Sequence, residues 1–331
     1  MRSMEEVIYK IFNGNKGILA ADESTPTMGK RLQSVGVAST ILNRHTYRHT
    51  IFSSPNLESY IGGVILYDET MYNEPTIEPL REKDIVLGIK VDKGAKPYDN
   101  YGGKLTEGLD GLSERLVKYK KKGAEFSKWR AVISVTDKDT CILANAWTLA
   151  RYAKKCQDEG IVPIVEPEVL MDHGCSIDTS FTVTRKVLHH VFDALFYENV
   201  KLDSVILKPN MILDGYSFEG SKASRQDISE LTLKCLKESV PPAIPAIAFL
   251  SGGQKDEDAI NNLAAMNKEF YLPWALSFSF GRTMQTGALQ HWSLSRPEQT
   301  QRWTTARAQS CANAVEGVNY MPVIPDIDFD K

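Results

Sequence analysis

The chain has 331 residues, 42% of them hydrophobic, and a formal net charge of −3. This length suits one large domain or two smaller ones, and the near-neutral charge offers no electrostatic basis for binding nucleic acid. No apolar run approaches the ~20 residues of a membrane-spanning helix, and no signal-peptide core is recognisable, so we expect no membrane association. Five dispersed cysteines without a CxxC pair indicate reduced thiols. We therefore predict a cytoplasmic protein.

Strand-like and helix-like segments alternate along the chain. MRSMEEVIYKIF places Val7, Ile8, Ile11 and Phe12 at helical spacing, which predicts an amphipathic first helix. Eight short apolar runs that end in polar or glycine residues follow, at 17–24, 62–69, 86–93, 126–135, 161–168, 204–211, 246–253 and 275–282. Helical patterns lie between most of these runs, most clearly at 111–123, 145–160, 179–199 and 224–240.

This alternation predicts a parallel sheet covered by helices. Eight such units in about 250 residues are typical of a (β/α)8 TIM barrel. The main alternative, a doubly wound open sheet, normally carries a Gly-rich dinucleotide-binding turn after its first strand, and GILAADES has none. We predict a single domain, in which residues 1–292 form the barrel with its N-terminal helix. Residues 293–331 add a C-terminal helical segment and an irregular tail.

Charged residues recur at the ends of the predicted strands, where a TIM barrel places its catalytic groups. In chain order they are Asp22, Lys93, Lys128, Arg130, Glu166, Glu168, Lys208 and Arg282. Side chains two apart on a strand point to the same face, so Lys128 accompanies Arg130, and the two glutamates accompany each other. A single charge at a strand end can simply mark where solvent begins. The whole set, converging on one mouth, predicts a catalytic site.

SVILKPNM carries Lys208 to the end of a buried strand. A free lysine has a pKa near 10.4, so only about 0.04% of it is the neutral amine that attacks a carbonyl at pH 7. Burial and a neighbouring cation, for which Lys128 is the candidate, lower the pKa of such an amine. Glu166 and Glu168 are candidates for moving protons, and Asp22 for holding a substrate hydroxyl. Together these side chains predict a Schiff-base mechanism.

Two neighbouring strand ends predict a phosphate site. LSGG ends one strand with Ser251, Gly252 and Gly253, where backbone N–H groups meet an anion without obstruction. SFGR ends the next strand with Gly281 and Arg282, which adds a guanidinium. TIM barrels often bind phosphate after strands seven and eight, which is where these two segments fall.

A second anion site is predicted at DESTPTMGKR. Thr25 is expected to cap a helix with Pro26 at its first position, which leaves N–H groups free. The side chains expected nearby are Ser24, Thr27, Lys30 and Arg31. A capped surface helix is the alternative. Two phosphate sites on opposite sides of one lysine would imply a bisphosphate substrate.

These segments resemble class I fructose-bisphosphate aldolase from about residue 14 to about residue 292. The matching stretches are GILAADES, GKRLQSVG, GGVILYDE, GIKVDKG, GLDGLSER, FSKWR, GIVPIVEPE, LKPNM, VPPA, FLSGGQ and PWALSFSFGR. The resemblance implies reversible cleavage of fructose 1,6-bisphosphate, a step of glycolysis and gluconeogenesis, by a metal-independent lyase without a cofactor. It also implies a homotetramer.

The resemblance further implies a role for each matching position. Lys208 would form the Schiff base, Glu166 would be the main acid and base with Glu168 and Lys128 assisting, and Asp22 would handle the C4 hydroxyl proton. The positions implied for the C1 phosphate are Ser251, Gly252, Gly253, Ser279, Gly281 and Arg282. Those implied for the rest of the substrate or its far phosphate are Thr27, Arg31, Lys93 and Arg130.

Two departures and two alternatives accompany the resemblance. Pro26 stands in a loop that usually contains glycine, which affects the expected geometry of Thr27. Many relatives end in a tyrosine that assists proton transfer at the enamine, whereas this chain ends DFDK and its nearest tyrosine is Tyr320.

The alternatives are another Schiff-base phosphosugar aldolase, such as a transaldolase-like enzyme, and a non-catalytic scaffold that binds polyanions. The metal-dependent aldolase route is disfavoured because the histidines are dispersed.

Overall fold

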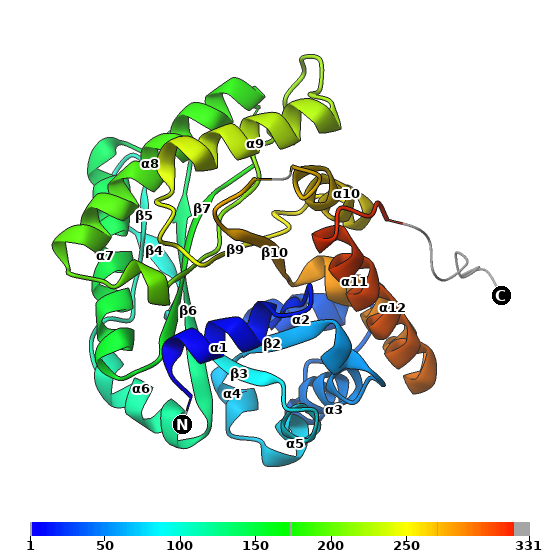
Figure 1. Cartoon of the computed structure of the whole chain (residues 1–331). Coiled ribbons are helices and arrows are strands. Elements are labelled where there is room, and N and C mark those ends of the chain that lie inside the picture. Colours follow the sequence, from blue (N-terminus) through cyan, green and yellow to red (C-terminus); the bar gives the residue numbers. More distant parts are fainter. Residues whose placement is uncertain (1, 173, 270, 321–331) are drawn as a thin grey trace.

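The computed structural model describes residues 2–172, 174–269 and 271–320, and within them eight parallel strands close into a barrel (Figure 1). The order around the barrel is β1, β2, β3, β6, β7, β8, β9 and β10, which returns to β1. These strands are β1 Gly17–Ala21, β2 Ile61–Leu66, β3 Val86–Lys90, β6 Ala124–Ile133, β7 Val162–Val169, β8 Ile206–Leu207, β9 Ala246–Phe249 and β10 Ala275–Phe280. The predicted TIM barrel is confirmed, and each predicted apolar run overlaps one of its strands.

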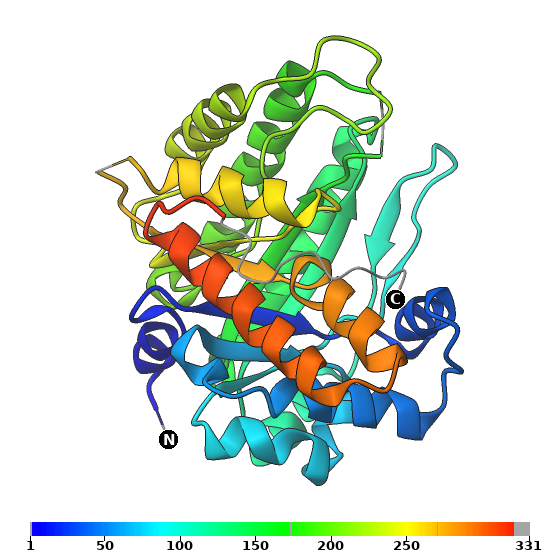
Figure 2. The same cartoon turned by 90° about the vertical axis from the view of Figure 1, so that its right-hand side faces the viewer.

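Helices surround the barrel on the outside. They are α1 Met4–Phe12, α2 Thr25–Ser34, α3 Ile41–Phe52, α4 Asp68–Met71, α5 Glu74–Glu82, α6 Leu112–Lys121, α7 Asp139–Asp158, α8 Ile177–Tyr197, α9 Arg225–Ser239, α10 Asp256–Met266, α11 Arg282–Ser293 and α12 Pro297–Val315. The predicted C-terminal helical segment is α12, which lies beside α11 (Figure 2). Outside the barrel, β4 Ala95–Pro97 and β5 Lys104–Thr106 form an antiparallel hairpin that projects from it (Figure 2). The division of the chain into one domain stays a prediction.

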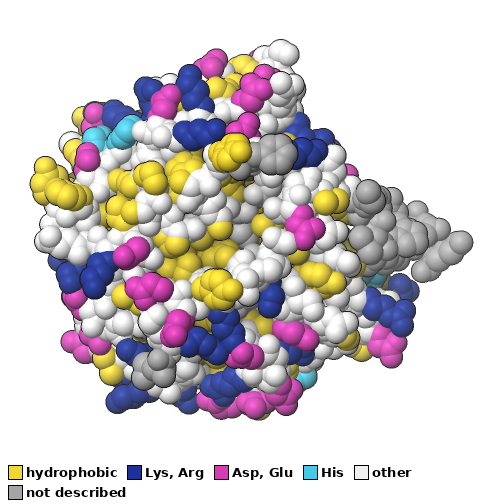
Figure 3. Space-filling model, viewed as in Figure 1, with side chains coloured by type: hydrophobic (Ala, Val, Ile, Leu, Met, Phe, Trp, Pro, Cys, Tyr) yellow, Lys and Arg dark blue, Asp and Glu magenta, His cyan; other side chains and the backbone are white. Residues whose placement is uncertain are grey.

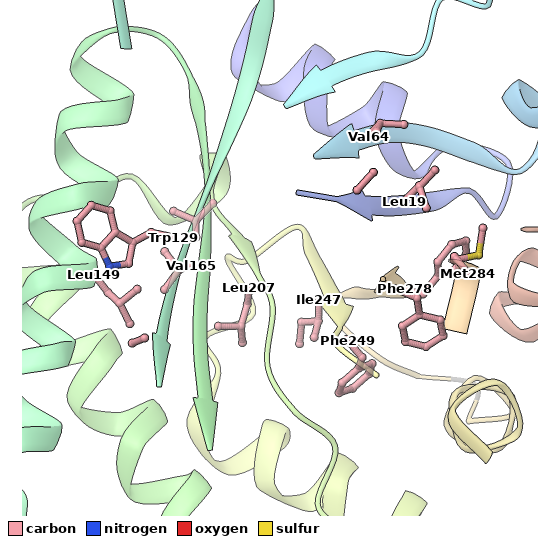
Figure 4. Close-up of a cluster of buried hydrophobic side chains, with 14 of the residues drawn as sticks. Leu19, Val64, Trp129, Leu149, Val165, Leu207, Ile247, Phe249, Phe278 and Met284 are labelled. Carbon is pink, nitrogen blue, oxygen red and sulfur yellow. The ribbon is translucent and has the colours of Figure 1, made fainter. Parts of the chain in front are cut away.

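The main hydrophobic core lies between the barrel and the helices. Outward-facing strand residues such as Leu19, Val165 and Phe278 pack there against helix residues such as Leu149 and Met284 (Figure 4). Side chains alternate along a strand, so the residues between these point into the barrel. The same strands therefore supply both the outer core and the lining of the barrel interior.

The barrel interior is apolar at one end and charged at the other. Its apolar half contains Ile18, Phe126, Ile164 and Ile206, with α1 closing the opening through residues such as Ile11. Further along the same inward face of the same strands come the charged residues, two or four positions later. Strand alternation thus delivers the charged groups to the C-terminal mouth of the barrel.

β8 is short because Pro209 follows it closely. Proline has no backbone N–H and cannot continue the ladder. The N–H of Lys208 still donates to the carbonyl of Val165 at 2.8 Å, so the lysine keeps the direction of the strand. Lys208 therefore points into the barrel, as Ile206 does.

Gly62 in β2 is a close contact between the barrel and α1. A Cβ atom at this position would lie 2.0 Å from the carbonyl oxygen of Ile11. Because a backbone atom cannot yield as a side chain would, we expect Gly62→Ala to lower the free energy of unfolding by about 3 kcal/mol in urea titrations. Tyr9→Ala, at a residue 68% exposed on the same helix, is the control and should change it by less than about 0.5 kcal/mol. An alanine variant as stable as the wild type would contradict this close approach.

Candidate active site

A cavity of about 380 Å³ lies at the C-terminal ends of the barrel strands. It is lined by Ala20, Asp22, Glu23, Ser24, Thr27, Arg31, Lys90, Lys128, Arg130, Glu166, Glu168, Lys208, Leu250, Ser251, Gly252, Ser279, Gly281 and Arg282. Of the site residues predicted from the sequence, Lys30, Lys93 and Gly253 are outside this lining, and the other side chains predicted for the catalytic and phosphate sites are in it. Residues far apart along the chain thus meet in one cavity with charged groups of both signs.

Four charged side chains form a continuous chain of contacts at the floor of the cavity. Lys208 Nζ lies 3.2 Å from Glu166 Oε1, and Lys128 Nζ lies 3.2 Å from Glu166 Oε2. Lys128 Nζ also contacts Asp22 Oδ2 at 2.7 Å. The side chains of both lysines and of Glu166 are only 5% exposed. Glu166 is therefore shared by two buried ammonium groups, one of which is the predicted nucleophile.

The two carboxyl groups of this chain have lowered pKa values. Burial alone would raise the pKa of Glu166, but Lys128, Lys208 and Arg130 outweigh it and lower that pKa. Burial would also raise the pKa of Asp22, but the nearby Lys128 and Lys208 outweigh it and hold that pKa well below the usual range. Burial opposes the charge of Lys128 as well, yet Asp22 and Glu166 raise its pKa. The resting site thus contains carboxylates and a Lys128 that stays cationic.

Acid unfolding should report on Asp22. Its pKa is lower in the folded chain than the ordinary value of 3.8, so its carboxylate stabilises the fold above that pH and this contribution is lost as the pH falls further. The wild type should therefore lose up to about 1.4 kcal/mol per pH unit through this group below about pH 4. Asp22→Asn should lack that part of the slope in urea titrations between about pH 2 and pH 4. Equal slopes for the two proteins would count against this charge assignment.

Glu168 and Arg130 form a separate pair nearer the mouth. Arg130 Nε donates to Glu168 Oε2, and the Arg130 side chain is 40% exposed whereas that of Glu168 is 11% exposed. Burial opposes the charge of Arg130, but Glu168 outweighs it and raises the pKa of the guanidinium. Although Glu168 follows Glu166 by two residues on the same face of β7, it contacts a different cation.

Ser251, Gly252 and Arg282 line the part of the cavity predicted to bind phosphate. Gly252 and Gly253 have φ angles of +60° and +86°, which glycine adopts without strain. Gly253 is outside the lining: a Cβ atom there would lie 3.0 Å from Arg282 Nη2, so its missing side chain makes room for the guanidinium. The buried hydroxyl of Ser279 has no hydrogen-bond partner within the described part of the chain. An anion bound here would supply one.

The predicted second anion site needs one correction. Ser24, and not Thr25, occupies the N-cap position of α2, with φ −60° and ψ 158°, and makes no side-chain capping hydrogen bond. Thr25 already belongs to the helix, and Pro26 fits its first turn, where a backbone N–H is not needed. Ser24 Oγ instead lies 3.1 Å from Thr27 Oγ1. Both hydroxyls line the cavity, whereas Lys30 is exposed and does not.

Lys90 takes the place in the cavity that was predicted for Lys93. Lys93 is exposed, beyond the end of β3, whereas Lys90 lines the cavity and its Nζ contacts Asp92 Oδ1 at 2.5 Å. Counting by twos from the inward-facing Val86 reaches residue 90 and misses residue 93, so strand alternation was the signal that identifies this residue. Glu23 is the other acidic or basic lining residue that was not predicted.

Neither a metal site nor a membrane-spanning helix is found among the described residues. In residues 2–172, 174–269 and 271–320, no group of three or more His, Cys, Asp or Glu side chains is arranged to hold a metal ion. No described helix combines the length and apolarity needed to cross a membrane. The predicted absence of a catalytic tyrosine at the C-terminus concerns residues 321–331, which lie outside the described residues.

Comparison with known proteins agrees with this geometry. A family model for class-I fructose-bisphosphate aldolase matches residues 3–324. The chain belongs to this family. Its members are metal-independent lyases, and the chain is accordingly a class I fructose-bisphosphate aldolase that cleaves fructose 1,6-bisphosphate reversibly to dihydroxyacetone phosphate and glyceraldehyde 3-phosphate through a lysine Schiff base. The predicted family and reaction class are confirmed.

Individual relatives cover most of the chain. The probable fructose-bisphosphate aldolase class 1 of Xanthomonas campestris is 47% identical over 302 residues, which are 88% of this chain and 90% of that protein. Fructose-bisphosphate aldolase C-A of Danio rerio is 44% identical over 302 residues, 88% of this chain and 83% of that one. The structure of the Plasmodium falciparum aldolase, in complex with TRAP and a small-molecule inhibitor, has a TM-score of 0.94 and 40% identity. That superposition covers 96% of this chain and 95% of the other.

Proposed function

We propose that Lys208 is the lysine that becomes covalently bound to the substrate. The observation that carries this assignment is the 3.2 Å contact between Lys208 Nζ and Glu166 Oε1 in a buried site. Transfer of one proton across this contact makes two reactants at once: a neutral amine that attacks the keto carbon, and a carboxylic acid beside the new hydroxyl. That acid can return the proton so that water leaves the carbinolamine and the iminium forms.

Lys128 and Asp22 have complementary roles in the proposed cleavage. The cationic Lys128, held between Glu166 and Asp22, stabilises negative charge that develops during proton transfer. Asp22 remains a carboxylate at neutral pH because its pKa is low, so it accepts the C4 hydroxyl proton as the bond between C3 and C4 breaks. The electron pair of that bond passes into the iminium and forms the enamine.

We propose two phosphate sites, one for each phosphate of the substrate. Ser251, Gly252, Ser279, Gly281 and Arg282 bind the C1 phosphate in this assignment, and the unpartnered Ser279 hydroxyl supports it. In the same assignment the far phosphate and the rest of the substrate contact Ser24, Thr27, Arg31, Lys90 and Arg130, which also line the cavity. Bisphosphate recognition of this kind requires no cofactor, metal or nucleic acid, and we propose that the chain works in the cytoplasm as an enzyme of glycolysis.

Trapping with borohydride tests the proposed nucleophile. The protein is incubated with dihydroxyacetone phosphate and borohydride, digested, and its peptides are identified by mass spectrometry. A reduced adduct on the lysine of LKPNM is the expected result. An adduct on another lysine, or none on a protein shown to be folded, would refute the assignment of Lys208.

We also propose that the chain assembles with copies of itself into a homotetramer, with the exposed aromatic cluster Trp147, Phe196 and Tyr197 in a contact between subunits. These side chains are 41%, 74% and 68% exposed, and the rings of Trp147 and Tyr197 stack with centroids 6.0 Å apart. Figure 3 shows hydrophobic side chains at the left edge of the molecule, where α7 lies in Figure 1. Exposed apolar clusters of this kind are typical of interfaces.

The surroundings of the aromatic cluster suit a second copy of the same surface. α7 and α8 carry the pair Lys186 and Asp139, and α7 carries the pair Lys154 and Asp158, so both signs of charge are available to a two-fold contact. Tyr197→Asp should shift sedimentation toward smaller species, because it places a charge in the buried contact. Tyr9→Asp, at an exposed tyrosine of α1, is the matched control. Unchanged sedimentation of the Tyr197 variant would exclude this cluster as a subunit contact.

A further inference from the structure

Glu23 is a buried acid beside the cavity that has no part in the proposed reaction steps. Its side chain is 4% exposed. Its Oε1 accepts hydrogen bonds from Arg31 Nη1 at 2.5 Å and from Gln285 Nε2 at 2.7 Å. Its Oε2 has no hydrogen-bond partner among the described residues, although Arg48 Nη2 lies 3.6 Å away. A buried acid in this position calls for an explanation beyond packing.

Glu23 is itself held firmly in place. The same Gln285 Nε2 donates to the carbonyl of Ala20 at 2.8 Å, and Arg48 Nη2 donates to the backbone carbonyl of Glu23 at 2.8 Å. Tyr47 contacts Gln285 from the other side through its hydroxyl. Because these groups are buried, the carboxylate is a fixed point between β1, α3 and α11.

Arg31 is much less constrained than its partner. Its side chain is 25% exposed, and it borders both the active-site cavity and a second cavity of about 220 Å³ between α2 and α11. In the described part of the chain its guanidinium makes one hydrogen bond, the one to Glu23. A guanidinium has five N–H donors, so it can keep that bond and still bind a phosphate. Without Glu23, nothing described would hold Arg31 toward the active-site cavity.

We propose that Glu23 is a positioning residue that aims Arg31 at the phosphate far from Lys208. This inference rests on the proposed substrate site. A second negative charge near a phosphate is unfavourable by itself, but Arg31 lies between the two anions and bridges them. Holding a long side chain in its binding geometry before the substrate arrives removes an ordering cost from binding, so the benefit falls on substrates that carry the far phosphate.

Kinetics with two substrates test the proposal. Glu23→Gln keeps the shape of the side chain and removes its charge. We expect it to raise KM for fructose 1,6-bisphosphate about tenfold with a much smaller change in kcat, as for loss of an interaction made equally in the ground and transition states. For fructose 1-phosphate, which lacks the far phosphate, KM should change less than about twofold. In an Arg31→Met background, Glu23→Gln should have no further effect on KM.

Glu69→Gln is the control for a merely structural role. Glu69 Oε1 lies 3.8 Å from Arg48 Nη1, and Glu69 also pairs with Arg44, but Glu69 is not part of the cavity lining. It should lower the thermal midpoint without changing the ratio of the two KM values. If Glu23→Gln does not fold, Glu23→Asp retains the charge near Arg48, withdraws the carboxylate from Arg31, and should still raise KM for the bisphosphate selectively.

Three results would overturn the proposal: an equal rise in KM for both substrates, a fall in KM for the bisphosphate, or no change in either. A fall would mean that Glu23 competes with phosphate for Arg31. Wild-type protein in the same assays separates this inference from the proposed function. If the wild type cleaves the bisphosphate and forms the Lys208 adduct, a failed Glu23 test leaves the proposed function standing.

Discussion

Lys208→Met is expected to lower kcat for fructose 1,6-bisphosphate cleavage by about 10⁵-fold or more, the scale seen when a covalent nucleophile is removed. Methionine has nearly the length of lysine, is unbranched and carries no charge. It cannot form an iminium, so the electron sink for bond cleavage is absent. Glu166 keeps Lys128 as its partner, so the substitution leaves no carboxylate unpaired and the fold should persist.

Lys90→Met is the matched control for this experiment. Lys90 lines the same cavity and, like Lys208, is a lysine at an inward-facing position at the end of a barrel strand. Its Nζ contacts Asp92 instead of Glu166. We expect it to raise KM while the borohydride adduct on Lys208 still forms. Circular dichroism of both variants checks the fold. Substantial cleavage by the methionine variant at position 208 would show that another group carries the chemistry.

The barrel and the centre of its active site were predictable because both depend on strand alternation. Apolar residues such as Ile164 begin the inward face of a strand, and Glu166 and Glu168 continue it two and four positions later. Once the strands are arranged as a parallel barrel, these charges must meet at one mouth. The wrong expectation for Lys93 came from choosing the last lysine of the segment instead of counting from the strand.

The helix α3, between β1 and β2, was harder to predict because its buried face carries charge. α3 buries Arg44, Tyr47, Arg48 and Ile51, a helical spacing that is visible only if the arginines are counted as buried. Arg48 can be buried because its guanidinium contacts Glu23, Glu69 and Thr70, which belong to other parts of the fold. Such partners are distant in sequence, so local patterns cannot reveal them. Glu23 was missed for the same reason.

Glu166→Gln is expected to lower kcat by about 10²–10⁴-fold, the usual contribution of a general acid–base group. The amide can accept a hydrogen bond from Lys208, but it cannot take the proton that keeps the lysine from attacking, nor return one to the carbinolamine. Imine formation itself should therefore slow. Rapid mixing with dihydroxyacetone phosphate, followed by borohydride quenching at increasing times, measures that step directly. Substrate binding should change far less, because the proposed phosphate sites are untouched.

Glu168→Gln separates this role from a general need for negative charge in the cavity. Both glutamates lie on the same face of β7, but Glu168 pairs with Arg130 near the mouth, whereas Glu166 contacts both Lys208 and Lys128. Trapping by the Glu168 variant should be slowed much less than by the Glu166 variant. If trapping were slowed equally in both variants, the carboxylates would act through the overall electrostatic field of the cavity. A selective loss with Glu166 would instead tie proton transfer to the one carboxylate in contact with the nucleophile.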